Sequence, residues 1–213
     1  MAFMKLQGFA NNMLKNGSGS WNGKPRLFNQ DKGTYSYGFS QANLDATSPF
    51  AATKVSKCWI EANSDIVPGS LITDLGDGTD WFVMTSRAQL TGEQRVYWDA
   101  TLYVISDYFW VKRFDVGPLG KDVNGRDRDI LPRLLVPTMI PTMVNPQKYG
   151  ITEQPDSLQE DNKIRVAVQK KHGIKNNDRL EDIDGNCLIV KNVDRYSLGS
   201  KGLHILWVDE DTR

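Results

Sequence analysis

Apolar and polar residues alternate with a period of two over much of the chain after residue 54. From Val96 to Val104 every second side chain is apolar, and the side chains between them are tyrosine, aspartate and threonine. This pattern is typical of a β-strand with one buried face. Further strands are predicted at residues 55–61, 71–74, 81–87, 110–116, 163–169, 179–181, 187–193 and 203–208.

Helical spacing of apolar residues is found at the N-terminus. Residues 2–15 have the pattern of one amphipathic helix, and the sequence Asn-Gly-Ser-Gly at 16–19 ends it. A helix this short is marginal alone in water, so it must dock, either on its own domain or on a neighbouring subunit. Residues 17–53, rich in Gly, Ser, Asn and Thr with scattered aromatic residues, are predicted to be an extended arm or loops.

Residues 117–150 interrupt the alternation with five prolines. The part at 121–129 is charged, and the part at 131–144 contains eight large apolar residues. Proline disfavours both a regular helix and a central strand. An exposed apolar stretch of this kind marks an interaction surface. We therefore expect the segment to contact a neighbouring subunit or partner instead of filling its own domain's core.

A similar order of turns and strands occurs twice. Residues 68–86 (PGSLITDLGDGTDWFVMTS) and 176–193 (NNDRLEDIDGNCLIVKNV) each contain a polar turn, a short strand, an Asp-Gly turn and an apolar strand. Their alignment matches Leu71 with Arg179 or Leu180. It also matches the turn Asp77-Gly78 with Asp184-Gly185, and residues 81–83 with residues 188–190. The sequence thus predicts two β modules that share one structure.

The predicted fold is mainly β, with two small antiparallel β-barrel or sandwich modules, a short N-terminal helix and a long Pro-rich insertion. The expected domains are the helix and arm at 1–53, the first β module at 54–116, the Pro-rich loop and linker at 117–162, and the second β module at 163–213.

The charges balance overall but not along the chain. Lys and Arg number 26, as do Asp and Glu. A net charge of zero argues against a protein that coats nucleic acid, because phosphate binding needs a basic surplus. Residues 1–60 contain seven basic and two acidic side chains, whereas residues 61–112 contain three basic and eight acidic ones. This asymmetry suits head-to-tail contact between copies, although solvated faces also produce it.

The sequence contains no recognisable catalytic constellation. Its two histidines, His172 and His204, and its two cysteines, Cys58 and Cys187, lack the spacing of metal ligands. A nucleophile elbow, a phosphate-binding loop and a dinucleotide fingerprint are all missing. The stretch DLGDGTD at 74–80 lacks the ordered ligands of a calcium loop. We therefore predict a protein that is not an enzyme and needs no metal and no cofactor.

Both cysteines lie in apolar runs, so free thiols in a reducing compartment are expected, with a single disulfide between them left open. The N-terminal residues lack the features of a signal peptide, and no apolar run reaches transmembrane length. We expect a soluble protein without a membrane anchor.

Residues 170–210 carry a resemblance to a known family. The segment has an Asp178-Arg179 dipeptide before a strand, a glycine turn, an apolar strand, and a last strand with apolar residues at Leu203, Ile205, Trp207 and Val208. This order resembles the head–tail connection proteins of tailed bacteriophages, called stopper, head-completion or neck proteins. The chain departs from the smallest stoppers in its length, its two modules and its Pro-rich insertion.

The resemblance implies a homo-oligomeric ring in the virion neck, assembled in the host cytoplasm. Its partners would be the portal or adaptor and the tail proteins, and DNA would pass through the channel without sequence-specific binding. The candidate channel loop consists of Lys121, Asp122, Arg126, Asp127, Arg128 and Asp129. Candidate intersubunit or portal and tail contacts are Phe3, Leu6, Met13, Leu134, Leu135, Met139, Ile140 and Met143.

Two other functions fit the same composition. One is a tail or baseplate structural component. The other is a carbohydrate-binding β module, because six tryptophans and seven tyrosines provide rings that can stack on sugars. Stoichiometry separates the classes: a neck protein forms rings or docks on one, whereas a binding module stays monomeric and retains sugar.

Overall fold

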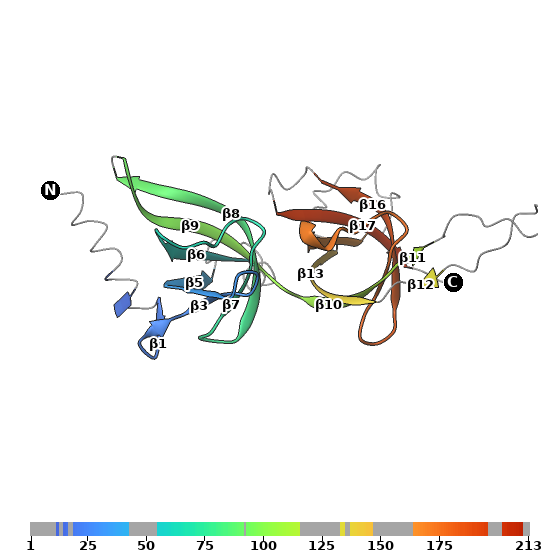
Figure 1. Cartoon of the computed structure of the whole chain (residues 1–213), viewed down its shortest axis with the longest axis horizontal. Coiled ribbons are helices and arrows are strands. Elements are labelled where there is room, and N and C mark those ends of the chain that lie inside the picture. Colours follow the sequence, from blue (N-terminus) through green and yellow to red (C-terminus); the bar gives the residue numbers. More distant parts are fainter. Residues whose placement is uncertain are drawn as a thin grey trace, which may run out of the picture. The chain divides into compact units, whose positions relative to one another are not determined.

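Figure 1 shows the computed structural model of the chain, which is mainly β. The described residues are 12, 15–16, 19–42, 55–91, 93–115, 133–134, 137–146, 164–195 and 202–210. The chain divides into two compact units. The first comprises Met1–Ile105, Gln169–Lys171 and Tyr196–His204, and the second comprises Ser106–Val168, His172–Arg195 and Ile205–Arg213.

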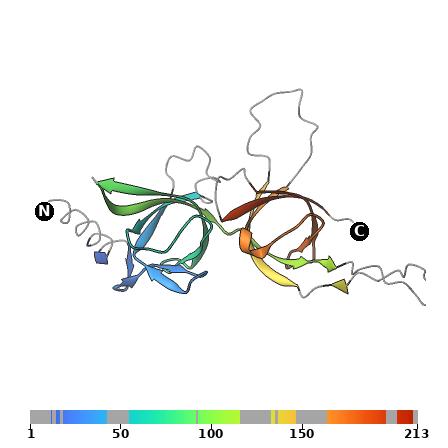
Figure 2. The same ribbon diagram turned by 45° about the horizontal axis from the view of Figure 1, so that its top comes forward.

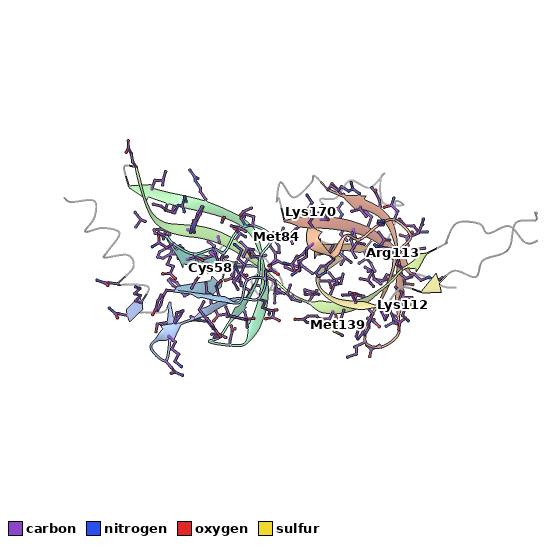
Figure 3. All side chains as sticks on the ribbon, viewed as in Figure 1. Cys58, Met84, Lys112, Arg113, Met139 and Lys170 are labelled. Carbon is purple, nitrogen blue, oxygen red and sulfur yellow. The ribbon has the colours of Figure 1, made fainter. Side chains whose placement is uncertain are left out.

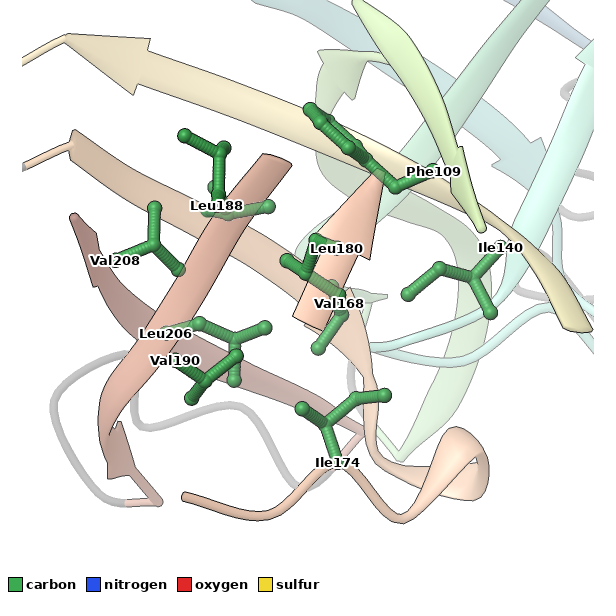
Figure 4. Packing of buried hydrophobic residues seen from close by; sticks show 10 residues of the cluster. Phe109, Ile140, Val168, Ile174, Leu180, Leu188, Val190, Leu206 and Val208 are labelled. Carbon is green, nitrogen blue, oxygen red and sulfur yellow. The ribbon is translucent and has the colours of Figure 1, made fainter. Parts of the chain in front are cut away.

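The second unit contains a closed barrel of six strands in the order β10-β13-β14-β17-β16-β15. Its strands are β10 (Asp107–Lys112), β13 (Thr138–Pro146), β14 (Ile164–Gln169), β15 (Arg179–Glu181), β16 (Cys187–Asp194) and β17 (Leu203–Glu210), and the 3₁₀ turn η1 (Lys170–His172) follows β14. The inward side chains form one apolar cluster, which consists of Phe109, Ile140, Val166, Val168, Ile174, Leu180, Leu188, Val190, Leu206 and Val208 (Figure 4). Each such side chain contributes roughly 1.5–3 kcal/mol when fully buried. Packed side chains therefore occupy the centre of the barrel.

The first unit contains a seven-stranded sheet in the order β4-β3-β7-β8-β9-β6-β5. Its strands are β3 (Leu27–Asn29), β4 (Thr34–Ser36), β5 (Gly38–Ala42), β6 (Val55–Glu61), β7 (Leu71–Asp74), β8 (Thr79–Thr91) and β9 (Gln94–Val104). The two outermost strands, β4 and β5, are separated in the chain by Tyr37 alone. The sheet must therefore curl until its edges meet at this residue, and Figure 2 shows its strands around a ring.

Two short ladders complete the described strands. β1 (Ser20–Trp21) pairs with β2 (Lys24–Pro25), and β11 (Phe114–Asp115) pairs with β12 (Arg133–Leu134). The predicted N-terminal helix lies almost wholly outside the described residues; Asn12, Lys15 and Asn16 are helical.

The two units share one strand topology. β13 pairs with β10 through its first half and with β14 through its second half. In the same way β4 pairs with β3, and β5 pairs with β6. The strands β7, β8 and β9 are consecutive neighbours, as are β15, β16 and β17, and β3 borders β7 as β10 borders β15. Each unit is therefore the same six-strand arrangement, with β4 and β5 together corresponding to β13.

The entry turn of the short strand is the same in both units. The Gly69 N–H donates to the Val83 carbonyl at 2.7 Å, and the Asn177 N–H donates to the Val190 carbonyl at 2.7 Å. Both turn residues have a left-handed backbone, with φ of 91° for Gly69 and 69° for Asn177. Glycine and asparagine are the residues that tolerate this conformation best. The match sets Val83 against Val190, as the alignment of residues 81–83 with 188–190 predicts.

A side-chain cap in this turn also recurs. The Ser70 hydroxyl accepts a hydrogen bond from the Val67 N–H at 3.1 Å. The Asp178 carboxylate accepts one from the Lys175 N–H at 2.8 Å. Serine and aspartate side chains fulfil the same local role here.

The hairpin turn after the short strand is built on an aspartate in both units. The Asp74 carboxylate accepts from the Gly76 N–H at 2.9 Å, and the Asp182 carboxylate accepts from the Asp184 N–H at 2.9 Å. Each is an Asx turn, in which the side chain mimics a backbone turn. The glycines of the two Asp-Gly pairs, at 78 and 185, have φ of 74° and 88°.

The following hairpins contain the same irregularity. The register shifts directly after Val83 in the β8–β9 pair and directly after Val190 in the β16–β17 pair. A β-bulge at the same position bends both strands alike. The prediction that the Asp77-Gly78 and Asp184-Gly185 turns are equivalent in two like modules is confirmed.

The prediction of an extended arm over residues 17–53 is wrong for residues 20–42, which form β1 to β5. Large and small side chains do alternate along β4 and β5, but the large ones lie on the outer face of the sheet. Ser36 and Gly38 face the interior, whereas Tyr35, Tyr37 and Phe39 alternate with them on the outer face. Large residues outside and small residues inside do not give the usual signal of a half-buried strand.

The expected boundary at residue 116 is also displaced. The strand predicted at 110–116 is β10, which begins the second barrel, and the first unit's leading segment ends at Ile105. Periodicity locates a strand but does not identify the sheet to which it belongs.

Part of the Pro-rich segment is a barrel strand, contrary to expectation. β13 contains Pro141 and ends at Pro146. The Ser106 N–H donates to the Thr142 carbonyl, so the even-numbered residues of β13 bond toward β10. β13 pairs with β14 only from Met143 onward. The missing N–H of Pro141 therefore removes no ladder hydrogen bond.

Candidate functional site

The candidate channel residues Lys121, Asp122, Arg126, Asp127, Arg128 and Asp129 lie outside the described residues. The same holds for Phe3, Leu6, Met13 and Leu135 among the candidate contacts. Leu134 is placed by its backbone alone, opposite Phe114 in the β11–β12 ladder. These predictions stay predictions.

The candidate contacts on β13 divide between the inside and the outside of the barrel. Ile140 is 1% exposed and belongs to the core cluster, and Met143 is 7% exposed. Ile140 fills the core of its own barrel, contrary to the prediction. Met143 is buried on the outer face of β13, and its contact with a partner stays a prediction. Met139 is 41% exposed on the outer face (Figure 3).

An outward row of aromatic residues crosses five strands of the first unit, β3, β4, β5, β6 and β9. We call it the aromatic strip, and it consists of Phe28, Tyr35, Tyr37, Phe39, Trp59 and Tyr97. Tyr35 is 60% exposed and Trp59 is 41% exposed, and the other four are half-buried.

Ring contacts link the strip across the strands. Phe28 and Tyr35 are directly opposite in the β3–β4 pair, with ring centroids 4.8 Å apart. Phe39 and Trp59 are directly opposite in the β5–β6 pair, with centroids 5.5 Å apart and an edge-to-face geometry. Trp59 and Tyr97 lie 5.3 Å apart. Such pairs add about 0.5–1.5 kcal/mol beyond their area burial.

Small interior residues hold the aromatic rings on the outer face. A Cβ atom at Gly38 would lie 2.6 Å from the Leu27 Cδ1 atom and 2.6 Å from the Trp59 carbonyl oxygen. The strand can therefore approach β3 and β6 only with glycine at this inward position, and its neighbours Tyr37 and Phe39 point out.

Cations gather around the strip. The Lys15 ammonium lies 5.4 Å from the centroid of the Tyr37 ring. The Arg95 guanidinium lies 4.1 Å from the Trp98 ring, which packs against the core from the other face of β9. Lys57 precedes Trp59 on the same outer face of β6. The Glu61 carboxylate accepts from the Tyr37 N–H at 2.9 Å, which ties the strip to the backbone.

A second notable surface lies at the Asp-Gly turn of the second barrel. We call it the acidic turn surface, and it consists of Asp107, Tyr108, Asp182, Ile183 and Asp184. Ile183 is 84% exposed and Tyr108 is 41% exposed. Partial burial raises the pKa of the Asp107 carboxyl, and the nearby charges of Asp182 and Asp184 raise that pKa further. Exposed apolar side chains therefore stand among three carboxylates, and the charges of Asp182 and Asp184 act on Asp107.

Two buried carboxylates are structural. Asp178 is 3% exposed and accepts from the Arg113 Nε–H at 2.7 Å, and this hydrogen bond raises the pKa of the Arg113 guanidinium. Asp74 is fully buried and accepts from the Arg26 Nε–H at 2.5 Å. The Asp178-Arg179 dipeptide singled out in the sequence thus supplies a buried ion pair at the base of β15.

The last strand also differs from its expected pattern. Leu206 and Val208 point into the barrel, whereas Trp207 lies on the outer face beneath the Arg165 guanidinium, 4.2 Å from it. The alternation of Leu203, Ile205 and Trp207 therefore marks the outer face of β17, because Leu206 sets the inner face.

Both cysteines are free thiols, which answers the open question of a disulfide. Burial raises the pKa of the Cys58 thiol strongly, so it stays protonated and unreactive. The described part of the chain contains no group of three His, Cys, Asp or Glu side chains that could hold a metal ion. None of the helices found in the described residues is long and apolar enough to cross a membrane.

Sequence reasoning missed both surfaces. The alternation of Tyr35, Tyr37 and Phe39 with small residues indicates the aromatic strip once a strand with large side chains outside and small ones inside is considered. The isolated Ile183 between two aspartates could have revealed the acidic turn surface. Comparison with known proteins adds no assignment: no family model, no curated protein and no solved structure matches this chain.

Proposed function

We propose that this protein is a structural component of the tailed-bacteriophage neck, which forms a ring of identical subunits between the portal and the tail. The observation that carries the proposal is the pair of exposed surfaces, one aromatic and one acidic, on small barrels whose described interior is packed with side chains. Exposed apolar patches on a packed domain mark protein–protein contacts. Assembly is the role that this arrangement serves best.

The position of the long insertion supports the same proposal. β11 and β12 pair with each other directly after β10 and before β13, so residues 116–132 join two strands of an extra ladder. The first unit has only residues 30–33 at the corresponding place, between β3 and β4. An insertion in one repeat of a duplicated fold is a candidate for the special function of that repeat. Its six charged candidate residues would line the channel through which DNA passes.

Imaging of the purified protein tests this proposal. We expect negative-stain electron microscopy to show closed rings with an open centre wider than a DNA duplex, which is about 20 Å. Antibody labelling of phage particles should then place the protein between head and tail. Single barrels without rings at all concentrations would contradict the proposal, and label at the distal end of the tail would assign the protein to the tail or baseplate.

The aromatic strip favours one second candidate, a carbohydrate-binding module. Exposed rings such as Tyr35 and Trp59 stack on sugars, but their tilted and edge-to-face packing leaves no shared flat platform. Retardation in a gel that contains polysaccharide would support this function. A folded protein that migrates identically with and without polysaccharide would argue against it.

A further inference from the structure

We propose that the aromatic strip of the first barrel receives the acidic turn surface of the second barrel from another copy of this chain. The inference rests on the proposed function, because it names the contact by which identical subunits join.

The duplication shows that the strip is an apolar surface in both barrels. Matching the strand registers sets the six strip positions against Trp110, Met139, Pro141, Met143, Ala167 and Leu203 of the second barrel. All six are apolar, although only one of them is aromatic. An outer face that stays apolar in both halves of a diverged repeat has a role in contact with other protein.

The two faces differ in how far they are covered. In the second barrel Met143 is 7% exposed, Ala167 is 8% exposed and Leu203 is 1% exposed. In the first barrel Tyr35 and Trp59 at the corresponding face are 60% and 41% exposed. Tyr35 and Trp59 are therefore the side chains of the strip that a second copy can bury.

Charge decides which surface of a second copy fits. Three cations stand around the strip, Lys15, Lys57 and Arg87, against the carboxylates Glu61 and Asp99. Glu61 already accepts the Tyr37 N–H, and Asp99 is directly opposite Arg87. The cations around the strip therefore outnumber its carboxylates by one.

The acidic turn surface has the complementary composition. It combines three carboxylates with the apolar side chains of Tyr108 and Ile183, and Ile183 is 84% exposed. Cations of a second copy would relieve the repulsion among Asp107, Asp182 and Asp184, while Ile183 packs against the rings of the strip. Opposite potentials of this kind set the register of a contact and speed association.

The contact joins two different surfaces, so it is heterologous. Each copy can give one surface and receive with the other, and repetition of the step yields a ring when the rotation closes.

Sedimentation velocity of the full chain over a range of concentrations tests the proposal. We expect Trp59→Asp to weaken self-association by at least about thirtyfold, as loss of a central aromatic anchor does. Lys57→Glu and Asp184→Lys should each weaken it by about tenfold, and the double variant should regain most of the loss. Lys191→Glu lies in neither surface and should leave self-association unchanged. Circular dichroism melting checks that each variant is folded.

The outcomes separate this inference from the proposed function. A monomeric wild-type protein overturns both. A wild-type ring that persists in folded Trp59→Asp and Lys57→Glu variants overturns only the inference. Self-association that appears only after removal of residues 2–14 would mean that the chain's own N-terminal segment covers the strip, and it would also overturn the inference. If the double charge variant does not regain self-association, the aromatic strip and the acidic turn surface are not partners, and the inference is overturned.

Discussion

Single residues define the outer face of the first barrel. Gly38 lies where a Cβ atom would meet the Trp59 carbonyl oxygen at 2.6 Å, and the backbone there cannot yield without opening the β5–β6 pair. We predict that Gly38→Ala lowers the free energy of unfolding by about 1–3 kcal/mol, as overpacking does. Urea denaturation followed by tryptophan fluorescence measures the change.

Gly33 provides the matched control for Gly38. It has φ of 67° and no heavy atom within 4 Å of an added Cβ, so Gly33→Asn keeps a backbone that asparagine tolerates. This variant should unfold close to the wild type. Equal stability of Gly38→Ala and wild type would show that the strands at this point are not held so closely.

The buried carboxylate of Asp178 holds two parts of the second barrel together. It accepts hydrogen bonds from the Nε–H and Nη2–H groups of Arg113 and from the Lys175 N–H. Asp178→Ala should destabilise the protein by about 1.5–3 kcal/mol, because it removes charge-assisted hydrogen bonds to Arg113 and leaves the Lys175 N–H without its acceptor. Ser70→Ala at the equivalent turn removes only a cap and should cost about 1 kcal/mol. Similar losses for the two variants would contradict this assignment.

The carboxylates of the acidic turn surface predict a pH dependence. The pKa of Asp107 is raised in the folded protein, so the fold holds this proton more tightly than the unfolded chain does. The ionised carboxylate therefore destabilises the fold above its folded pKa, and this penalty disappears as the pH falls below its unfolded pKa. Asp107→Asn should be more stable than wild type at pH 7, by less than about 1 kcal/mol because the site is largely exposed.

Thermal unfolding at several pH values measures this difference. The stability advantage of Asp107→Asn should shrink as the pH is lowered through the acid range. A constant advantage from pH 7 to pH 3, or a less stable variant at pH 7, would show that repulsion at Asp107 is not its cause.

Most individual strands could be located from the sequence. The predicted ranges 55–61, 71–74 and 179–181 coincide with β6, β7 and β15, because their apolar residues alternate and their ends carry turn residues. β4 and β5 were not predicted from the sequence, because their interior residues are small. β13 was not predicted because its prolines argue against a strand. Its pairing with β10 in the first half and β14 in the second half, which makes Pro141 acceptable, cannot be read from the sequence.

If the Pro-rich segment only made contacts with partners, deletion of residues 118–146 would leave a folded, soluble monomer that no longer joins the particle neck, but the described strands change this expectation. Deletion of residues 118–146 would remove β12 and the whole of β13, including the core residue Ile140, and should unfold the second barrel. Replacement of residues 116–132 by a short Gly-Ser linker should instead leave both barrels folded, because the β11–β12 ladder spans the gap. Proton NMR dispersion of the two variants distinguishes these outcomes, and an unfolded linker variant would contradict the strand assignment.

The candidate site could be predicted only in part, because it depends on which strands become neighbours. Met139 was a candidate contact and is exposed, yet Ile140 beside it points into the core. The aromatic strip gathers residues 28 to 97 from strands that are far apart in sequence. Periodicity assigns a residue to a face of its own strand, and only the topology assembles faces into a surface.

At the scale of the whole molecule, two copies of one barrel architecture are joined in a single chain. The turn at Gly69 and Asn177 and the bulges after Val83 and Val190 recur in both copies. The described differences between the copies lie in the loops and outer faces, where the proposed contacts between subunits would form. The central claim is therefore that identical chains associate into a closed ring through these outer faces.

Native mass spectrometry of the wild-type protein tests that claim most directly. The account predicts one dominant closed oligomer whose mass is an integer multiple of the 24.0 kDa chain, without a ladder of larger species. A monomer as the dominant species at micromolar concentration, or an open series of oligomers without a preferred size, would contradict it.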